Sequence, residues 1–270
     1  MKILLTNDDL NEASLSTSNL GFIPTMGSLH NGHISLIKKS LIYCTKTIVS
    51  IFVNPKQFNN KNDYKNYPRN TKKDLKILKK LKIDYVYIPN KKDVYSSKNR
   101  IRIFLTKKDK ILCAKFRKGH FEGVIDVMIR LTDKIKPSKI FMGEKDFQQL
   151  LLVKKYIEKN FNSKIISCKT IRNNNKLALS SRNLLLKKKD LNKAGKISSN
   201  LISFKKKLSK IKITKKLINK KKKELEKLFD INIEYLEIRN KKNLILSNKI
   251  NNSKIFIAYY LKNIRLIDNF

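Results

Sequence analysis

The chain has 270 residues, 41% of them hydrophobic, which is enough apolar material for the core of one large domain or two smaller ones. This composition excludes a disordered chain. The formal net charge of +41 would suit a polyanionic partner, but only nine of the 62 basic residues are Arg. Because the chain is also rich in Asn and Ile, we attribute the charge to the codon drift of an AT-biased genome.

The cysteines and the apolar runs indicate the cellular compartment. Cys44, Cys113 and Cys168 stand more than fifty residues apart and form no C-x-x-C pair, which favours a reducing compartment over a disulfide framework. Residues 1–14 lack the apolar stretch of a secretion signal, and the longest apolar run, about seven residues at 255–261, is too short to cross a bilayer. We therefore expect a soluble, cytoplasmic protein with no membrane partner.

β-rich runs and helical patterns alternate through the first two thirds of the chain. Strands are expected at 20–24, 47–53, 85–89, 139–142 and 164–169, and helices at 34–43, 71–81, 123–135 and 148–161. All seven glycines lie at or before Gly195 and all five prolines at or before Pro137, so tight turns are concentrated in the same part. This order predicts an α/β fold with a Rossmann-like parallel sheet and helices on both faces.

The pattern changes after about residue 175. Residues 196–230 contain thirteen Lys together with leucines at helical spacing, and 233–238 and 255–260 have the composition of strands. We predict two domains, 1–175 with the parallel sheet and 176–270 as a smaller C-terminal α+β domain. The Lys-rich helices are interpreted as solvated faces rather than as a nucleic-acid surface.

The segment from Gly21 to Leu36 contains the strongest candidate site. A β-run ends in a Gly-containing turn, and a helix then begins with His30 and His33 on one side of its first turn. Free N–H groups and the helix dipole favour an anion at such a position, and Gly32 lets a phosphate approach the backbone. The segment therefore predicts a phosphate-binding site.

Three alternative motifs fit this segment less well. The glycines match part of a P-loop, but the required Lys and Ser or Thr do not follow Gly32. The G-x-G-x-x-G fingerprint of a Rossmann dehydrogenase does not occur in the chain. Zinc at His30 and His33 needs a third ligand, and neither Cys44 nor His120 has a spacing that demands it.

H-x-G-H after a strand resembles the signature of the nucleotidyltransferase superfamily, which attacks the α-phosphate of ATP. Further motifs make the resemblance specific, because they occur in the order and near the spacing of the pantothenate synthetase family. They are Pro24-Thr-Met-Gly-Ser-Leu-His-Asn-Gly-His33, Ser50-Ile-Phe-Val-Asn-Pro-Lys-Gln57, Tyr67-Pro-Arg, His120-Phe-Glu-Gly-Val, Phe141-Met-Gly-Glu-Lys-Asp-Phe-Gln-Gln149, Leu179-Ser-Ser-Arg-Asn183 and Arg265-Leu-Ile-Asp-Asn269. The resemblance covers the chain from about residue 20 to the C-terminus.

This resemblance implies the ATP-dependent condensation of (R)-pantoate with β-alanine, giving pantothenate, AMP and diphosphate through a pantoyl adenylate. It also implies a homodimer, with 1–175 binding nucleotide and pantoate and 176–270 closing as a lid. No enzyme nucleophile is required, because the first step needs positioning and stabilisation of charge on phosphate oxygens. We predict His30, His33 and Lys145 as catalytic residues; the family treats the second histidine as a proton donor, and its charge state stays open.

The resemblance also implies the binding residues. The predicted ATP contacts are Met26, Gly27, Ser28, Leu29, His30, Asn31, Gly32, His33, Gly143, Glu144, Lys145, Asp146, Ile171, Leu179, Ser180, Ser181 and Arg182. The predicted contacts of pantoate and β-alanine are Asn54, Gln57, Tyr67, Arg117, His120 and Gln149. Mg²⁺ is expected to accompany ATP, with Asp74 as its ligand.

Four positions depart from the family pattern. Asp126 stands where Thr is usual, Lys73 where an acid often precedes Asp74, and Lys176 and Lys262 where Gly is usual. Lys176 is expected to stiffen the chain before the Ser-Ser-Arg motif. Two other functions stay open: a different H-x-G-H nucleotidyltransferase, and a basic nucleic-acid-binding protein, against which the scarcity of Arg counts.

Overall fold

The computed structural model describes residues 1–14, 18–96, 101–209 and 211–270. The chain divides into two compact units, Met1–Lys169 and Thr170–Phe270. Residues 170–175, which the sequence placed in the first domain, belong to the second unit because of their pairing. Arg172 forms a β-bridge with Ala178, and its guanidinium binds both carboxylate oxygens of Asp268 at 2.7 and 2.8 Å. The roles predicted for the two domains stay predictions.

The first unit is built on a six-stranded sheet in the order β1-β4-β3-β2-β5-β6, with every neighbouring pair parallel. The α/β prediction is therefore confirmed. The strands are β1 (Lys2–Leu4), β2 (Leu20–Thr25), β3 (Lys46–Ile51), β4 (Tyr85–Tyr87), β5 (Lys139–Gly143) and β6 (Lys164–Cys168). The sequence pattern missed β1, because only one of its three side chains, Leu4, is buried.

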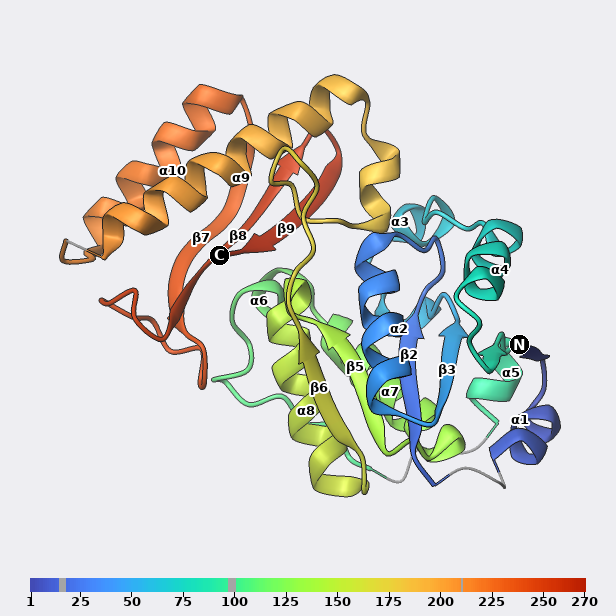
Figure 1. Ribbon diagram of the computed structural model, residues 1–270. Coiled ribbons are helices and arrows are strands. Elements are labelled where there is room, and N and C mark those ends of the chain that lie inside the picture. The colour runs from blue at the N-terminus through green and yellow to red at the C-terminus, as the bar shows by residue number, and fades with distance from the viewer. Residues whose placement is uncertain (15–17, 97–100, 210) are drawn as a thin grey trace. The chain divides into compact units, whose positions relative to one another are not determined.

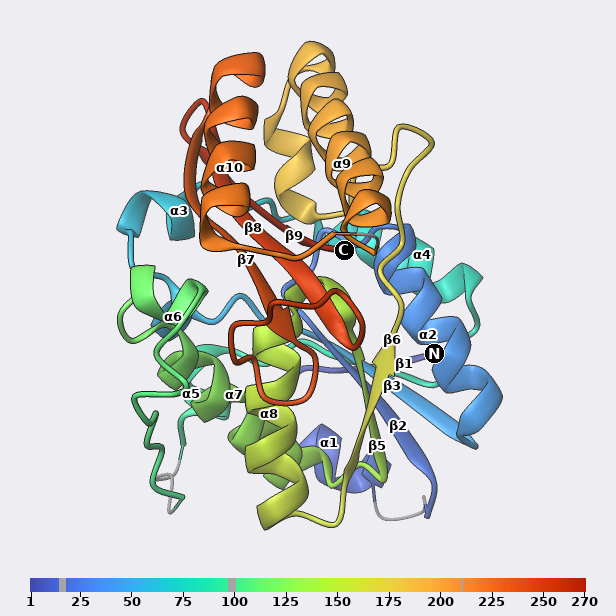
Figure 2. The same cartoon turned by 90° about the vertical axis from the view of Figure 1, so that its left-hand side faces the viewer.

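Helices cover both faces of this sheet. They are α1 (Asn7–Ser14), α2 (Asn31–Tyr43), α3 (Lys61–Lys65), α4 (Thr71–Lys80), α5 (Lys91–Val94), α6 (Cys113–Phe116), α7 (His120–Ile135) and α8 (Phe147–Asn160), with the 3₁₀ turns η1 (Pro55–Gln57) and η2 (Glu144–Asp146). On one face Ile37 of α2 and Leu78 of α4 pack against Ile23 and Val49 of the strands. Figure 2 shows α7 and α8 on the other face.

Strands β2 and β3 are buried almost throughout, as expected of central parallel strands that are covered on both faces. β2 lies between β3 and β5, so the direction in which the chain adds strands reverses at β2. Open parallel sheets bind ligands beyond the carboxyl ends of the strands at such a switch point. The segments that follow Thr25 and Gly143 are therefore neighbours at the edge where a site is expected.

The second unit holds an antiparallel sheet with the order β7-β8-β9, formed by β7 (Asn232–Asn240), β8 (Ser253–Leu261) and β9 (Ile264–Asn269). Helices α9 (Lys188–Leu208) and α10 (Lys215–Phe229) lie together on one face of this sheet, as Figure 1 shows, and η3 (Ser181–Leu185) precedes them. Leu201, Leu225, Ile255 and Ile257 form the centre of the core. The helical pattern predicted over 196–230 is thus two helices, with position 210 between them outside the described residues.

The Lys-rich helices of the second unit are not uniformly solvated. Most lysines of α10 are exposed, but Lys221 is 8% exposed, lies 5.2 Å from the ring centre of Phe204 and binds Glu224 at 2.6 Å. The aliphatic stem of Lys221 therefore packs in the core, while its ammonium group pairs with the carboxylate of Glu224. In the part of the chain that the structure describes, no helix has the length and apolar character needed to span a bilayer.

Candidate active site at the carboxyl edge of the sheet

The loop between β2 and α2 turns sharply through two residues with left-handed backbone, Gly27 (φ 77°) and Ser28 (φ 55°). Thr25 anchors the start of this loop, because its hydroxyl donates to the Ser50 carbonyl at 2.7 Å and accepts the Gly27 N–H at 3.1 Å. A side chain on Gly27 would place its Cβ 3.0 Å from Asp74 Oδ2 and 3.1 Å from Ile51. Glycine is thus required there by conformation and by space.

The carboxylate of Asp74, in the first turn of α4, lies directly beneath the loop. Its Oδ2 accepts the Ser28 N–H at 2.7 Å and its Oδ1 accepts the Leu29 N–H at 2.8 Å. Asp74 is 2% exposed. Both oxygens are therefore turned toward backbone N–H groups in the interior, and Asp74 does not fit the Mg²⁺ ligand that the resemblance implied. The N–H groups of Ser28 and Leu29 point at Asp74 rather than into the site.

His30 and His33 cap the first turn of α2 through reciprocal hydrogen bonds. His30 is the N-cap residue and its Nδ1 accepts the Gly32 N–H at 3.1 Å, while His33 Nδ1 accepts the His30 N–H at 3.3 Å. The imidazoles lie face to face with a tilt of 35° and 4.1 Å between ring centres. This is a reciprocal capping box in which imidazole nitrogens replace the usual oxygens.

Burial and neighbouring charges set the protonation of both rings, and the capping geometry sets the tautomer. Burial, followed by the charge of Lys145, lowers the pKa of His30 to about 4. Burial, followed by His30 and Lys145, lowers the pKa of His33 to about 3. Both imidazoles are therefore neutral near pH 7, and because each Nδ1 accepts a hydrogen bond, each ring carries its proton on Nε2. In the protein without ATP, the two histidines are therefore neutral and each offers an Nε2–H donor.

Lys145 supplies the positive charge of this site. It lies in η2, which follows the carboxyl end of β5, and its side chain is 17% exposed. Its amine is 3.6 Å from Asp146 Oδ1, and its charge acts on both histidines, as their lowered pKa values show. The structure thus brings His30, His33 and Lys145 together. One ammonium group beside two neutral N–H donors is suited to phosphate oxygens.

A second group of predicted residues surrounds Gln57 at the end of η1. Asn54 is 1% exposed and its amide donates to the Gly123 carbonyl at 3.0 Å and to Gln57 Oε1 at 3.2 Å. Gln57 in turn donates to the sulfur of Met26 at 3.0 Å, in the loop that leads to the histidines. α7 approaches η1 closely at Gly123, where a Cβ would lie 2.3 Å from the Lys56 carbonyl oxygen.

Arg117 and His120 hold the backbone of the same turn. His120 Nδ1 donates to the Gln57 carbonyl at 2.6 Å, and its Nε2 accepts from Arg117 Nη1 at 2.9 Å. Tyr67 is 8% exposed and packs edge-on against Phe58, with 5.6 Å between ring centres. Asn54, Gln57, Arg117 and His120 therefore form one hydrogen-bonded cluster, and its role toward pantoate and β-alanine stays a prediction. Gln149 is half-buried on α8.

The remaining predicted ATP contacts lie in the second unit. The Ile171 carbonyl accepts the Leu179 N–H at 3.0 Å. Ser180 caps η3 by accepting the Arg182 N–H at 3.3 Å, and Ser181 is 5% exposed. The local turn therefore brings these residues into one loop, and their role toward ATP stays a prediction.

The described residues offer no metal centre. In the ranges 1–14, 18–96, 101–209 and 211–270, no group of three or more His, Cys, Asp and Glu side chains is arranged to hold an ion. The Nδ1 atoms of His30 and His33 are already engaged with backbone N–H groups. A zinc site on the histidine pair, which the sequence left as an alternative, therefore has no supporting donors in the described part of the chain.

A network next to Gln57 was missed by the sequence analysis. Asp126 lies between Arg130 at 2.8 Å and Lys56 at 3.4 Å, and both cations also lie over the Tyr95 ring, at 4.7 and 4.0 Å. Burial raises the pKa of the Tyr95 hydroxyl, which donates to Asn54 Oδ1 at 2.8 Å. Asp126 thus balances two cations that flank one ring. These residues belong to no common motif, so no sequence signal links them.

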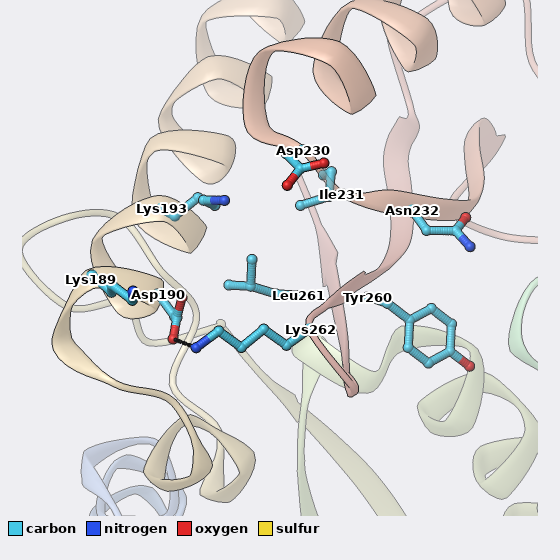
Figure 3. A pocket seen from close by; sticks show the side chains of 9 residues that line it. All are labelled: Lys189, Asp190, Lys193, Asp230, Ile231, Asn232, Tyr260, Leu261 and Lys262. Carbon is cyan, nitrogen blue, oxygen red and sulfur yellow. Dashed lines mark ion pairs between the residues drawn. The ribbon is translucent and has the colours of Figure 1, made fainter.

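The second unit also contains a pocket of about 600 Å³ (Figure 3). It is lined by Lys189, Asp190, Lys193, Asp230, Ile231, Asn232, Tyr260, Leu261 and Lys262. Lys262 has a left-handed backbone (φ 54°) and its amine pairs with Asp190 at 2.9 Å. The lining contains no residue that the sequence analysis assigned to a substrate, and its three lysines outnumber its two aspartates.

Comparison with known proteins gives a consistent result over the whole chain. The family model for pantoate-β-alanine ligase matches residues 2–270. The chain is 40% identical over 264 residues to the pantothenate synthetase of Francisella tularensis subsp. novicida (strain U112), covering 95% of this chain and 90% of that protein. It is 39% identical to the pantothenate synthetase of Francisella philomiragia subsp. philomiragia, covering 97% of this chain and 92% of that protein.

Solved structures agree in fold. The crystal structure of a pantoate-β-alanine ligase from Francisella tularensis, complexed with β-γ ATP and β-alanine, superposes with a TM-score of 0.84 at 38% identity. It covers 100% of this chain and 97% of that chain. Pantothenate synthetase from Thermus thermophilus gives a TM-score of 0.86 at 27% identity, with 100% and 99% coverage.

Proposed function

The chain belongs to the pantoate-β-alanine ligase family and is an ATP-dependent ligase of pantothenate biosynthesis; on this premise we propose that it works in two steps through a pantoyl adenylate. In the first step a carboxylate oxygen of pantoate attacks the α-phosphorus of ATP. The bond from that phosphorus to the oxygen bridging to the β-phosphate breaks, and diphosphate leaves. In the second step the β-alanine amine attacks the acyl carbon, AMP leaves with the carboxylate oxygen, and the amine loses a proton.

The first step needs charge stabilisation at the phosphate oxygens. We assign this to the Nε2–H groups of His30 and His33 and to the ammonium of Lys145, which lie at the switch point of the sheet. Because the imidazoles are neutral before ATP binds, they stabilise the growing charge as hydrogen-bond donors, and Lys145 supplies the full positive charge. The donors are fixed in place by the capping box, so little reorganisation accompanies the reaction.

The cluster around Gln57 is assigned to pantoate and β-alanine. The carboxamide of Gln57 has two N–H donors and an acceptor oxygen, which can orient a carboxylate and hydroxyls without changing their charge. Asn54, Arg117 and His120 fix both the side chain and the backbone of this glutamine. The contact from Gln57 to Met26 places it beside the loop that carries the histidines, which supports attack of pantoate on an α-phosphate held there.

We assign the second-unit residues Ile171 and Leu179 to Arg182 to ATP by their resemblance to the family motif. We also expect Mg²⁺ to accompany ATP without Asp74 as its ligand, and we expect a homodimer in the cytoplasm. Sedimentation of the purified protein tests the dimer, and activation by Mg²⁺ in an ATP titration tests the ion.

The observation that carries this proposal is the meeting of His30, His33 and Lys145 at the carboxyl edge of the sheet. The test uses ATP labelled in the α-phosphate. Pantoate alone should release diphosphate and leave the label on an enzyme-bound adenylate, and labelled AMP should appear only when β-alanine is added. Labelled AMP that forms without pantoate, or no labelled product at all, would contradict the proposal.

A further inference from the structure

We propose that Asp74 is a positioning residue that holds the ATP-binding loop by its backbone. It would set the place of the histidines without contacting ATP or a metal ion itself. The proposal rests on the function proposed above, but the contact that carries it is a property of the chain alone. Lys73, the neighbouring departure from the family pattern, is exposed and is not needed for this role.

The contact is a two-point clamp. Each carboxylate oxygen of Asp74 accepts one backbone N–H, from Ser28 at 2.7 Å and from Leu29 at 2.8 Å. Such short bonds to an ionised acceptor are about twice as strong as neutral ones. Asp74 lies in the first turn of α4, where the positive end of the helix dipole attracts a negative group.

The loop needs this clamp because of its conformation. Ser28 is a non-glycine residue with a left-handed backbone, and Ser28 and Leu29 are only 5% and 7% exposed. Their N–H groups would be buried without an acceptor if the carboxylate were absent, which is costly for any backbone donor. His30 follows directly, so a shift of this turn would move both imidazoles.

The experiment replaces Asp74 with Asn. The side chain keeps its size, but one acceptor oxygen becomes an NH₂ group that faces a backbone N–H. Binding of a non-hydrolysable ATP analogue is measured by calorimetry, once with Mg²⁺ and once in EDTA. We expect D74N to weaken binding by about 10-fold, because a buried backbone N–H of the loop loses its acceptor and the turn before His30 shifts, and by the same factor in both buffers. Unchanged binding, or a loss seen only with Mg²⁺, would overturn the clamp.

A matched control is available at the opposite edge of the same sheet. Asp84 accepts the Thr47 N–H at 2.8 Å and pairs with Lys46 at 2.9 Å. D84N therefore removes a comparable contact from a carboxylate to the backbone, far from the loop. We expect D84N to lower stability and to leave the affinity for the analogue unchanged. An equal loss of affinity in D84N would show that the effect in D74N is general destabilisation and would refute the assignment.

A measurement without ligand separates the clamp from the proposed function. Amide hydrogen exchange at Ser28 and Leu29 should be slow in the wild type and in D84N, and fast in D74N. Protected amides in a protein that binds no ATP would refute the proposed function and leave the clamp standing. Fast exchange in the wild type would refute the clamp whatever ATP does. If D74N does not fold, G27A serves instead, because its Cβ would press on Asp74 Oδ2 from 3.0 Å, and it should weaken analogue binding alike in both buffers. Unchanged binding in G27A would also overturn the clamp.

Discussion

The neutral histidine pair makes the stability of the protein depend on pH in a way that can be measured. The folded pKa values are about 4 for His30 and about 3 for His33, against an ordinary value of 6.5. Because both values are lowered, the unfolded chain binds more protons between pH 6.5 and pH 3. The stability from the neutral pair is fully present above pH 6.5 and is lost as the pH falls. At pH 5 protonation stabilises each histidine of the unfolded chain by roughly 2 kcal/mol. The free energy of unfolding is therefore about 4 kcal/mol lower at pH 5 than at pH 7.5.

The test compares the wild type with a double variant that keeps the capping box without titrating groups. Asn is a favoured N-cap residue and Gln is a natural partner three residues later, so we choose His30→Asn with His33→Gln. Urea unfolding followed by circular dichroism at pH 7.5, 6 and 5 should show a steeper decline in the wild type, by about 4 kcal/mol at pH 5. The acidic side chains and His120 are present in both proteins, so their contributions to the pH dependence cancel in the difference between the two. Parallel declines, or ring carbon shifts showing protonated His33 at pH 6, would refute the reasoning.

Three further predictions follow from the site and from the backbone. Lys145→Ala should slow adenylate formation by ~10²- to 10³-fold, as loss of a donor to a developing anion does, whereas Lys139→Ala at the other end of β5 should leave diphosphate release unchanged in a stopped assay. Lys176 has a left-handed backbone (φ 71°), so Lys176→Gly should raise the unfolding free energy by about 1 kcal/mol. The control Lys196→Gly, in the middle of α9, should lower it by about 1 kcal/mol. Melting temperatures that shift in the same direction in both variants would contradict this reasoning. Tyr95→Phe removes one donor to the buried amide of Asn54, which holds Gln57, the residue that we propose binds pantoate. KM for pantoate should therefore rise severalfold at unchanged kcat, and a fall in kcat alone would argue against a positioning role.

Periodicity and turn residues predicted the central part of the fold well. β2, β3 and β5 each contain a short run of buried apolar residues, and α2, α4, α7 and α8 have the spacing of amphipathic or buried helices, so each was visible in the sequence. β1 and β9 were not predicted. β1 buries one side chain, and β9 includes Arg265 and Asp268, whose charges are compensated by Glu234 and Arg172 at distant positions. Such pairings are tertiary and leave no local pattern.

The candidate site was predictable in its membership but not in its electrostatics. The order of motifs placed His30, His33 and Lys145 in one site, because the carboxyl ends of neighbouring parallel strands meet. The charge of the imidazoles depends on burial and on which nitrogen accepts a backbone N–H, and neither can be read from a sequence. The role of Asp74 was also hidden, because its partners, Ser28 and Leu29, contribute only backbone groups.

The capping of α2 by imidazole nitrogens has a consequence for chemical labelling. An electrophile attacks the nitrogen that carries the lone pair, and in His30 and His33 that atom is occupied by a backbone N–H. The lone pair of His120 is likewise taken by Arg117. Acylating reagents directed at histidine should therefore react slowly with the native protein, and the rate at which they do react would measure how often the first turn of α2 opens.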